Sequence, residues 1–311
     1  MENLYDVLII GAGPAGMTAG IYAKRAELSV AIIEGTGIYG GQILNTYEVE
    51  NYPGFESISG LELGDKFRAH AEKFGVPFID ENVTKITDAD KIKEVTLENG
   101  DVLRTKAVIL ATGARNRKLE VEGEERLSGC GVSYCATCDG GFFKNKEVVV
   151  CGGGNTAVED GIFLSRICKK VYVIHRREEF RADKTLVGKL KSCPNVEILW
   201  NTKVTAINGN EQVESVTVTN TKDTTDEDEN QTISVDGVFV AIGTVPESEL
   251  YVGLASLDEA GYVVANEDCK TGTFGLFVAG DVRKKPIKQV ITAASDGANA
   301  VNSVVEFLNA Y

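Results

Sequence analysis

The amino-acid sequence predicts an α/β protein whose parallel sheets form two nested domains. Three observations lead to this prediction: short apolar runs that end near glycine, helical stretches between some of them, and an internal repeat. The chain has 311 residues, about twice the roughly 150 of one average domain. Hydrophobic residues make up 43% and charged residues 25%, as in ordinary globular proteins, so we expect the whole chain to fold.

The expected strands are continuous apolar runs that are rich in Val and Ile. Runs of this kind are typical of strands buried on both faces of a parallel sheet. They lie at 7–10, 30–33, 108–111, 148–150, 171–174, 238–242 and 276–279. Helices are expected at 15–25, at 156–166 and from about residue 289 onward.

The repeat appears when the chain is shifted against itself so that Gly11 aligns with Gly152. Residues 11–16 then align with 152–157, and residues 31–34 with 172–175. Each copy has a strand before its glycines and a helix after them. The sequence therefore predicts two Rossmann-like dinucleotide-binding units.

The first unit resumes after the second, because residues 275–281 read as another buried strand that ends in a glycine turn. The crossings are placed at the similar strand ends 111–114 and 241–244. We therefore expect the second domain to be inserted into the first. The boundaries expected are 1–114 and 247–311 for the first domain and 115–246 for the second.

Each glycine motif is expected to bind a pyrophosphate. Backbone N–H groups and the positive end of the following helix dipole meet the phosphates, and glycine lets them approach closely. The alternative is a glycine turn that only allows the strand and the helix to pack closely and binds no nucleotide. The residues concerned are Gly11, Gly13, Pro14, Ala15 and Gly16 in the first copy, and Gly152, Gly154, Asn155 and Thr156 in the second.

The residues after the second strand of each copy indicate which nucleotide binds. Glu34 can accept hydrogen bonds from free ribose hydroxyls, as on the adenosine of FAD, and would repel a 2′-phosphate. The second copy has His175, Arg176, Arg177 and Arg181 instead, and guanidinium groups suit a phosphate dianion. The sequence thus favours NADP(H) over NAD(H) there, the alternative being solvated arginines.

Between the motifs lies a C-x-x-C pair, Cys135 and Cys138, which can form a small-ring disulfide with fast thiol exchange. Asp139 follows directly and is placed to act as general acid or base. The alternatives are zinc binding and two unpaired buried thiols. Zinc normally needs four ligands; Cys130 could give a third, but the two histidines of the chain, His70 and His175, are remote in sequence, so no metal is expected.

Charge and cysteine usage exclude several classes of function. Asp plus Glu outnumber Lys plus Arg by 46 to 32, a net charge of −14, which opposes binding to nucleic acid or anionic membranes. No apolar run approaches the ~20 residues of a membrane span, and no signal peptide is expected. Seven cysteines make no disulfide framework, so we expect a cytoplasmic protein. The acidic segment 221–230 reads as a solvated hairpin tip.

Taken together, these motifs resemble the low-molecular-weight thioredoxin reductases, and the match runs nearly end to end. The matching segments are 11–16, 40–42, 48–51, 135–140, 152–158, 175–177 with Arg181, and 280–281. The resemblance implies a homodimeric flavoenzyme in which NADPH reduces FAD, FAD reduces a disulfide, and the dithiol reduces thioredoxin.

The resemblance also assigns roles by position. Cys138 would face the flavin, Cys135 would attack the disulfide of thioredoxin, and Asp139 would handle the proton. The NADPH domain would rotate between the two half-reactions, with its hinge near Ala114 and Thr244. The remaining residues expected at the cofactors are Gly41, Gln42, Asn51, Gly113, Gly280, Asp281, Gln289, Val290 and Ile291.

The sequence departs from the family pattern at two places. The family commonly has x-x-P-N after A-I-G, whereas this chain has Thr244-Val245-Pro246-Glu247, and Lys288 stands where Arg is frequent. Related alternatives are a flavin dithiol oxidase or ferredoxin-driven reductase, a peroxiredoxin-reducing flavoprotein, a ferredoxin-NADP reductase and a redox-sensing module. The intact second glycine motif and arginine cluster argue against the dithiol oxidase and the ferredoxin-driven reductase. A peroxiredoxin-reducing flavoprotein usually carries an extra N-terminal thioredoxin-like region, whereas the first strand here is expected to begin by residue 7. A ferredoxin-NADP reductase needs no C-x-x-C pair, and a redox-sensing module needs neither two complete units nor a disulfide between them.

Overall fold

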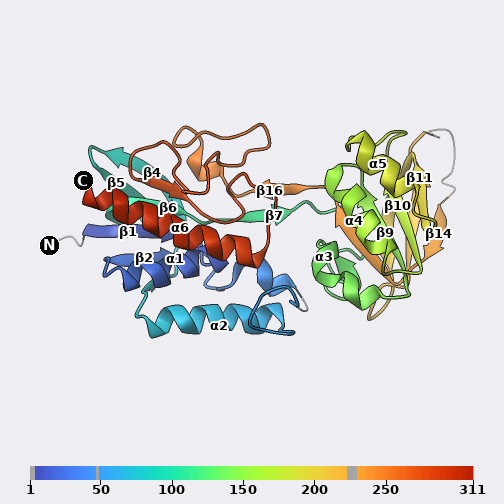
Figure 1. The fold of residues 1–311 in the computed structure, drawn as a ribbon, viewed down its shortest axis with the longest axis horizontal. Coiled ribbons are helices and arrows are strands. Elements are labelled where there is room, and N and C mark those ends of the chain that lie inside the picture. The colour runs from blue at the N-terminus through green and yellow to red at the C-terminus, as the bar shows by residue number, and fades with distance from the viewer. Residues whose placement is uncertain (1–3, 47–48, 223–229, 311) are drawn as a thin grey trace. The chain divides into compact units, whose positions relative to one another are not determined.

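A computed structural model describes residues 4–46, 49–222 and 230–310 of the chain. The chain divides into two compact units, whose elements are labelled in Figure 1. The first unit comprises Met1–Leu44, Tyr52–Arg115 and Val245–Tyr311, and the second comprises Asn45–Asn51 and Asn116–Thr244. The chain passes between them through β7 (Ala114–Asn116) and β16 (Thr244–Pro246), which pair with each other.

The first unit is built on a seven-stranded sheet. Its order is β3-β2-β1-β6-β5-β4, with β17 also paired to β6. Strands β1, β2, β3, β6 and β17 run parallel, whereas β4 and β5 form an antiparallel extension. The strand bounds are β1 Leu4–Ile10, β2 Val30–Ile33, β3 Phe78–Ile79, β4 Val83–Ala89, β5 Ile92–Leu97, β6 Val102–Leu110 and β17 Leu276–Val278.

Three helices pack on one face of this sheet: α1 (Pro14–Arg25), α2 (Gly60–Lys73) and α6 (Val290–Asn309). Because successive strand residues point to opposite faces, Val7 and Ile9 of β1 pack beneath these helices. Leu8 and Ile10 pack on the other face, against side chains of β4, β5 and the segment 250–282. Short 3₁₀ helices lie at Gly41–Asn45 (η1) and Glu249–Tyr251 (η3).

The second unit repeats the plan on a five-stranded parallel sheet, in the order β11-β10-β9-β15-β8. One face is covered by α4 and α5 and the other by a three-stranded antiparallel sheet, β12-β13-β14. The bounds are β8 Val132–Ser133, α3 Ala136–Asp139, η2 Gly140–Phe143, β9 Glu147–Gly152, α4 Asn155–Ser165, β10 Lys170–His175, α5 Lys184–Lys191, β11 Val196–Trp200, β12 Thr202–Asn208, β13 Ser215–Asn220, β14 Gln231–Ser234 and β15 Gly237–Ala241.

The predicted α/β class is confirmed, and all seven expected strands are present as β1, β2, β6, β9, β10, β15 and β17. The three expected helices correspond to α1, α4 and α6. For the acidic segment 221–230, the flanking strands β13 and β14 do pair in antiparallel fashion. Most of the predicted tip itself, residues 223–229, lies outside the described residues. Within the described ranges, no helix is long and apolar enough to cross a membrane.

Candidate functional site

The first glycine motif forms a turn between the end of β1 and the start of α1. A Cβ at Gly11, whose φ is +106°, would lie 2.4 Å from the carbonyl oxygen of Ala111. A Cβ at Gly16 would lie 1.9 Å from the carbonyl oxygen of Gly11, so these two glycines allow strand and helix to pack closely. A Cβ at Gly13 would meet nothing within 4 Å. Gly13 thus borders open space at the helix N-terminus, where a phosphate can approach the backbone.

Two further segments meet this turn. Glu34, directly after β2, accepts a hydrogen bond from the backbone N–H of Ala12 at 3.0 Å through Oε2. Its other oxygen accepts from Thr36. Gly41, at the start of η1, has a φ of +62°, and a Cβ there would lie 3.2 Å from Cα of Gly13. The predicted residues Gly11 to Gly16, Glu34 and Gly41 are therefore gathered at one place.

Several other predicted residues of the first unit follow strands whose carboxyl ends lie at the same edge of the sheet, or begin α6. Gly113 follows β6, and Gly280 and Asp281 follow β17; these strands run parallel to β1, so their carboxyl ends lie together. Gln289 caps α6 through a reciprocal pair of hydrogen bonds with Thr292. Val290 and Ile291, both expected at the cofactor, form the first turn of that helix.

The structure does not group all predicted residues in this way. Gln42 is exposed on η1, and Asn51 belongs to a segment that clusters with the second unit.

The two residues that depart from the family pattern, Glu247 and Lys288, each contact a neighbouring side chain. Glu247 pairs with Arg115 at 3.1 Å, and the ammonium group of Lys288 lies 3.5 Å from the ring centroid of Tyr262.

The second glycine motif forms the equivalent turn between β9 and α4. A Cβ at Gly152 would lie 2.3 Å from the carbonyl oxygen of Ala241, whereas a Cβ at Gly154 would meet nothing within 4 Å. Asn155 and Thr156 open α4 and are exposed. Asn155 exchanges hydrogen bonds with Asp183, at 3.0 and 2.9 Å, and so joins the helix start to the loop after β10.

The basic residues of that loop fall into two kinds. His175 is buried against Gly153, where any Cβ would clash with the imidazole, and its Nε2 lies 3.0 Å from the carbonyl oxygen of Glu179. Burial lowers the pKa of His175, and the neighbouring arginines lower it further. Arg176, Arg177 and Arg181 are exposed, and none forms an ion pair with another residue that the structure describes. Their guanidinium groups are open to an anionic ligand.

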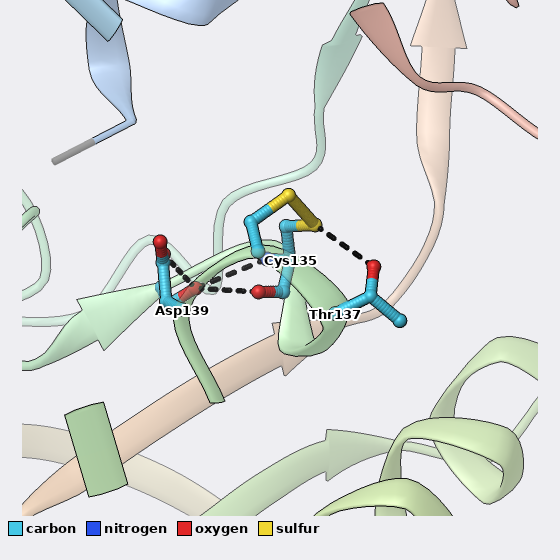
Figure 2. Close-up of a disulfide and its surroundings, with 5 residues drawn as sticks. Cys135, Thr137 and Asp139 are labelled. Carbon is cyan, nitrogen blue, oxygen red and sulfur yellow. Dashed lines mark hydrogen bonds between the residues drawn. A yellow bond between two sulfur atoms is a disulfide. The ribbon is translucent and has the colours of Figure 1, made fainter. Parts of the chain in front are cut away.

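Cys135 and Cys138 form a disulfide, with their Cα atoms 5.3 Å apart (Figure 2). Cys135 caps the short helix α3, and Cys138 and Asp139 form its last turn. The hydroxyl of Thr137 lies 3.4 Å from Sγ of Cys135. Both cysteines are half-buried, so the disulfide is accessible from outside the unit. The predicted redox disulfide is present.

Asp139 is held beside the disulfide by Ser133, whose hydroxyl donates to Oδ2 at 2.6 Å. The same Ser133 oxygen accepts from the backbone N–H of Cys135 at 3.1 Å, which ties the carboxyl group to the disulfide loop (Figure 2). Oδ1 of Asp139 is buried and finds no hydrogen-bond partner in the described part of the chain. Burial raises the pKa of Asp139, and the Ser133 hydrogen bond partly opposes the rise.

Sequence reasoning did not find every residue that shapes these sites. Ser133 was missed because a serine two positions before a cysteine is no signal by itself. Asp296 was also missed, although a single charged residue within the otherwise uncharged helical stretch 290–304 is a detectable anomaly. Among the described residues, no group of three or more His, Cys, Asp or Glu side chains is arranged to hold a metal ion.

Comparison with known proteins agrees with this geometry. The family profile described as "Pyridine nucleotide-disulphide oxidoreductase" matches residues 5–297. A curated thioredoxin reductase from Bacillus subtilis (strain 168) is 46% identical over 308 residues, covering 99% of this chain and 96% of that protein. One from Listeria innocua serovar 6a is 44% identical over 308 residues, covering 99% and 95%. The crystal structure of thioredoxin reductase from Streptococcus pyogenes MGAS5005 matches with a TM-score of 0.93 at 42% identity, covering 100% of both chains.

Two glycine turns and a disulfide within a matching profile define the class of protein: the chain belongs to the pyridine nucleotide-disulphide oxidoreductase family. Within that family, its full-length similarity places it among the bacterial-type thioredoxin reductases, as the resemblance predicted. Family membership implies the use of a flavin and a pyridine nucleotide.

Proposed function

We propose that this chain is an NADPH-dependent thioredoxin-disulfide reductase, in which electrons pass from NADPH to FAD, then to the Cys135–Cys138 disulfide and finally to thioredoxin. One observation carries the proposal: an accessible disulfide beside a half-buried carboxyl group, in a chain with two dinucleotide turns. In this proposal, residues 1–114 and 247–311 bind FAD and residues 115–246 bind NADPH.

The residues of the first unit fit FAD. Gly13 leaves space for a pyrophosphate at the N-terminus of α1, and Glu34 lies where ribose hydroxyls are read. Oδ1 of Asp281 is buried and accepts no hydrogen bond from the residues described, as expected of an oxygen that accepts from a ribitol hydroxyl. We assign Gln289, Val290 and Ile291 to the helix end that faces the isoalloxazine ring.

The residues of the second unit fit NADPH. Gly154 provides the open position at the N-terminus of α4, and the exposed guanidinium groups of Arg176, Arg177 and Arg181 suit a 2′-phosphate. His175 holds the loop after β10 in place, because its imidazole packs against Gly153 and its Nε2 lies 3.0 Å from the Glu179 carbonyl oxygen.

When bound, FAD supplies a two-electron carrier between NADPH and a disulfide. Two electrons and two protons convert the Cys135–Cys138 disulfide into two thiol groups, and the Cys135 thiol then loses its proton to become the attacking thiolate. The Cys135 thiolate attacks the disulfide of thioredoxin and forms a mixed disulfide. Attack by Cys138 on Cys135 then restores the original disulfide and releases thioredoxin as a dithiol. Asp139 holds the proton that moves in these steps.

We also propose a homodimer in the cytoplasm whose NADPH domain rotates about the connection near Ala114 and Thr244 between half-reactions. The full-length similarity to curated thioredoxin reductases and the five unpaired cysteines support this. A monomer in sedimentation experiments at micromolar concentration would count against the dimer.

The proposal is tested with Cys135→Ser and Cys138→Ser. Each variant should lose NADPH-dependent thioredoxin reduction by more than about 100-fold in kcat/KM, because one remaining cysteine cannot form the disulfide that accepts the electrons. Both should keep bound FAD, since the residues assigned to FAD lie outside the segment 115–246 that carries the two cysteines. Cys130→Ser, an exposed free cysteine nearby, is the matched control and should keep wild-type activity. Retained turnover in both active-site variants would contradict the proposal.

A further inference from the structure

Helix α6 buries a carboxylate among small and apolar residues. Asp296 is 1% exposed, and its inward-facing neighbours on the helix include Ala293, Gly297 and Ala300. A buried carboxylate is costly unless it is paired and hydrogen-bonded. Its partners therefore indicate what the charge does at this position.

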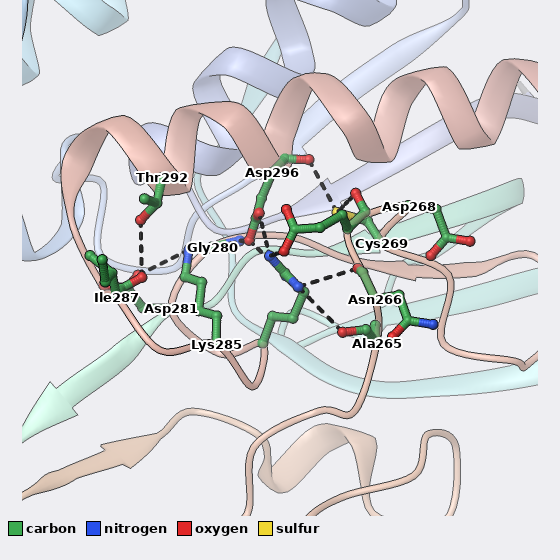
Figure 3. Close-up of polar contacts among 12 residues, drawn as sticks. Ala265, Asn266, Asp268, Cys269, Gly280, Asp281, Lys285, Ile287, Thr292 and Asp296 are labelled. Atoms are coloured by element: carbon green, nitrogen blue, oxygen red, sulfur yellow. Dashed lines mark hydrogen bonds and ion pairs between the residues drawn. The ribbon is translucent and has the colours of Figure 1, made fainter.

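Asp296 reaches from α6 to the turn after β17 (Figure 3). Its Oδ2 accepts from the backbone N–H of Gly280 at 3.0 Å, from Nε of Arg283 at 3.0 Å and from Nζ of Lys285 at 3.2 Å. Its Oδ1 accepts from Nη2 of Arg283 at 2.8 Å. The carboxylate thus gathers a backbone donor and two cations around the Gly280–Asp281 turn.

The two cations have different surroundings. Arg283 also donates to the carbonyl oxygens of Ala265 and Asn266 and to the exposed carboxylate of Glu267, so its remaining donors hold that loop. Lys285 makes no such loop contacts within the described ranges. Its side chain is 3% exposed, and its ammonium group lies between Asp296, at 3.2 Å, and Oδ1 of Asp281, at 3.5 Å.

The position of Lys285 bears on Asp281. The 3.5 Å separation is longer than an ordinary hydrogen bond, so Oδ1 of Asp281 keeps its capacity to accept one while lying beside a buried cation. Burial raises the pKa of Asp281, and Lys285 is the first of the cations that oppose the rise. The turn itself packs on α1: a Cβ at Gly280, whose φ is +82°, would lie 2.8 Å from Cβ of Ala15.

We propose that Lys285, anchored on Asp296, is a positioning residue for FAD: it fixes the Asp281 carboxylate so that Oδ1, which accepts no hydrogen bond from the described residues, accepts one from a ligand hydroxyl. This inference rests on the proposed function, because it requires FAD in the first unit. Lys285 acts through Asp281 and does not itself contact the ligand.

The test compares Lys285→Met with Lys284→Met. Both remove one positive charge, but Lys284 is exposed and lies 3.7 Å from Asp258, away from Asp281. Apoproteins are titrated with FAD, following flavin fluorescence. We expect the Kd for FAD to rise at least about tenfold in Lys285→Met and to stay within about twofold of wild type in Lys284→Met.

A double-mutant cycle with Asp281→Asn separates positioning from a general structural role. In the Asp281→Asn background, Lys285→Met should change the Kd for FAD by less than about twofold, because the carboxylate through which Lys285 acts is gone. If the Lys285→Met apoprotein does not fold, Lys285→Gln, whose amide can still donate a hydrogen bond, takes its place in the same cycle.

Equal and independent losses of FAD affinity in both backgrounds would overturn the inference, as would a Lys285→Met protein that binds FAD like Lys284→Met. These results leave the proposed function intact as long as the wild-type protein binds FAD and reduces thioredoxin. A wild-type protein that binds no FAD would instead overturn the proposed function itself.

Discussion

Asp139 illustrates at the scale of one residue how the environment shifts the pKa of a carboxyl group. Burial raises its pKa, and the Ser133 hydroxyl limits the rise by donating to Oδ2 at 2.6 Å. A raised pKa brings the group closer to neutral pH, where a general acid or base works best. Ser133 therefore tunes the group as well as holding it.

The change Ser133→Ala tests this role. The hydrogen bond lowers the pKa of Asp139, so its removal should move the Asp139-dependent limb of the pH–rate profile for thioredoxin reduction to higher pH. The limb should be absent in Asp139→Asn. Thr137→Ala, which removes a neighbouring hydroxyl that contacts Cys135 but not Asp139, should leave the limb where it is in wild type. A limb that moves to lower pH in Ser133→Ala would show that burial and the hydrogen bond are wrongly assigned.

Single-residue features differ in how well the sequence predicts them. Cys135, Cys138 and Asp139 lie close together in sequence, and their spacing predicted a disulfide with a carboxyl group beside it. The contact between Asp296 and Lys285 joins a helix to a turn, and it depends on how α6 packs. No local pattern reports such packing, so this contact could not have been predicted.

At the scale of one element, the glycines at the start of α1 have different surroundings. Gly16 lets the helix contact the turn, because a Cβ would lie 1.9 Å from the Gly11 carbonyl oxygen. Gly13 has no such neighbour within 4 Å, although it stands three residues earlier in the same turn. The two positions therefore serve different purposes within one motif.

Alanine substitutions should separate these purposes. Gly13→Ala should change the free energy of unfolding of the apoprotein by less than about 1 kcal/mol, yet raise the Kd for FAD at least about tenfold, because the new methyl group occupies the space kept for phosphate. Gly16→Ala should destabilise the apoprotein by about 3 kcal/mol or more. Denaturant unfolding and FAD titration measure both quantities.

The second turn supplies the matched control for Gly13→Ala. Gly154 is also open, so Gly154→Ala should leave FAD binding unchanged and raise the KM for NADPH. Weakened FAD binding in Gly154→Ala, with Gly13→Ala unaffected, would reverse the assignment of the two units.

Elements buried on both faces were the easiest to predict. Strands such as β1 and β9 are continuous apolar runs, and the repeat of their glycine turns identified the helices that follow. The pair β4-β5 and strand β12 were not expected as elements, and for β13 and β14 the sequence indicated only the hairpin tip between them. In these strands buried residues alternate with more exposed ones and Thr is frequent, which weakens the apolar signal.

For the whole molecule, the second unit is inserted into the chain of the first. The first sheet gains its strand β17 after the second unit has been completed, and β17 pairs with β6, the strand that precedes the crossing. The sequence revealed this because the run at 276–279 has the same form as the earlier strands. The exact partners of each strand required the structure.

The proposed function requires that this chain draw electrons from NADPH through FAD. This requirement is tested by an anaerobic titration of the FAD-loaded protein with NADPH and, in parallel, with NADH, following flavin absorbance near its visible maximum. We predict that NADPH bleaches the flavin at a concentration at least about tenfold lower than NADH, because Arg176, Arg177 and Arg181 present guanidinium groups to the 2′-phosphate. Bleaching by neither nucleotide would contradict the account and favour a dithiol oxidase or a ferredoxin-driven enzyme.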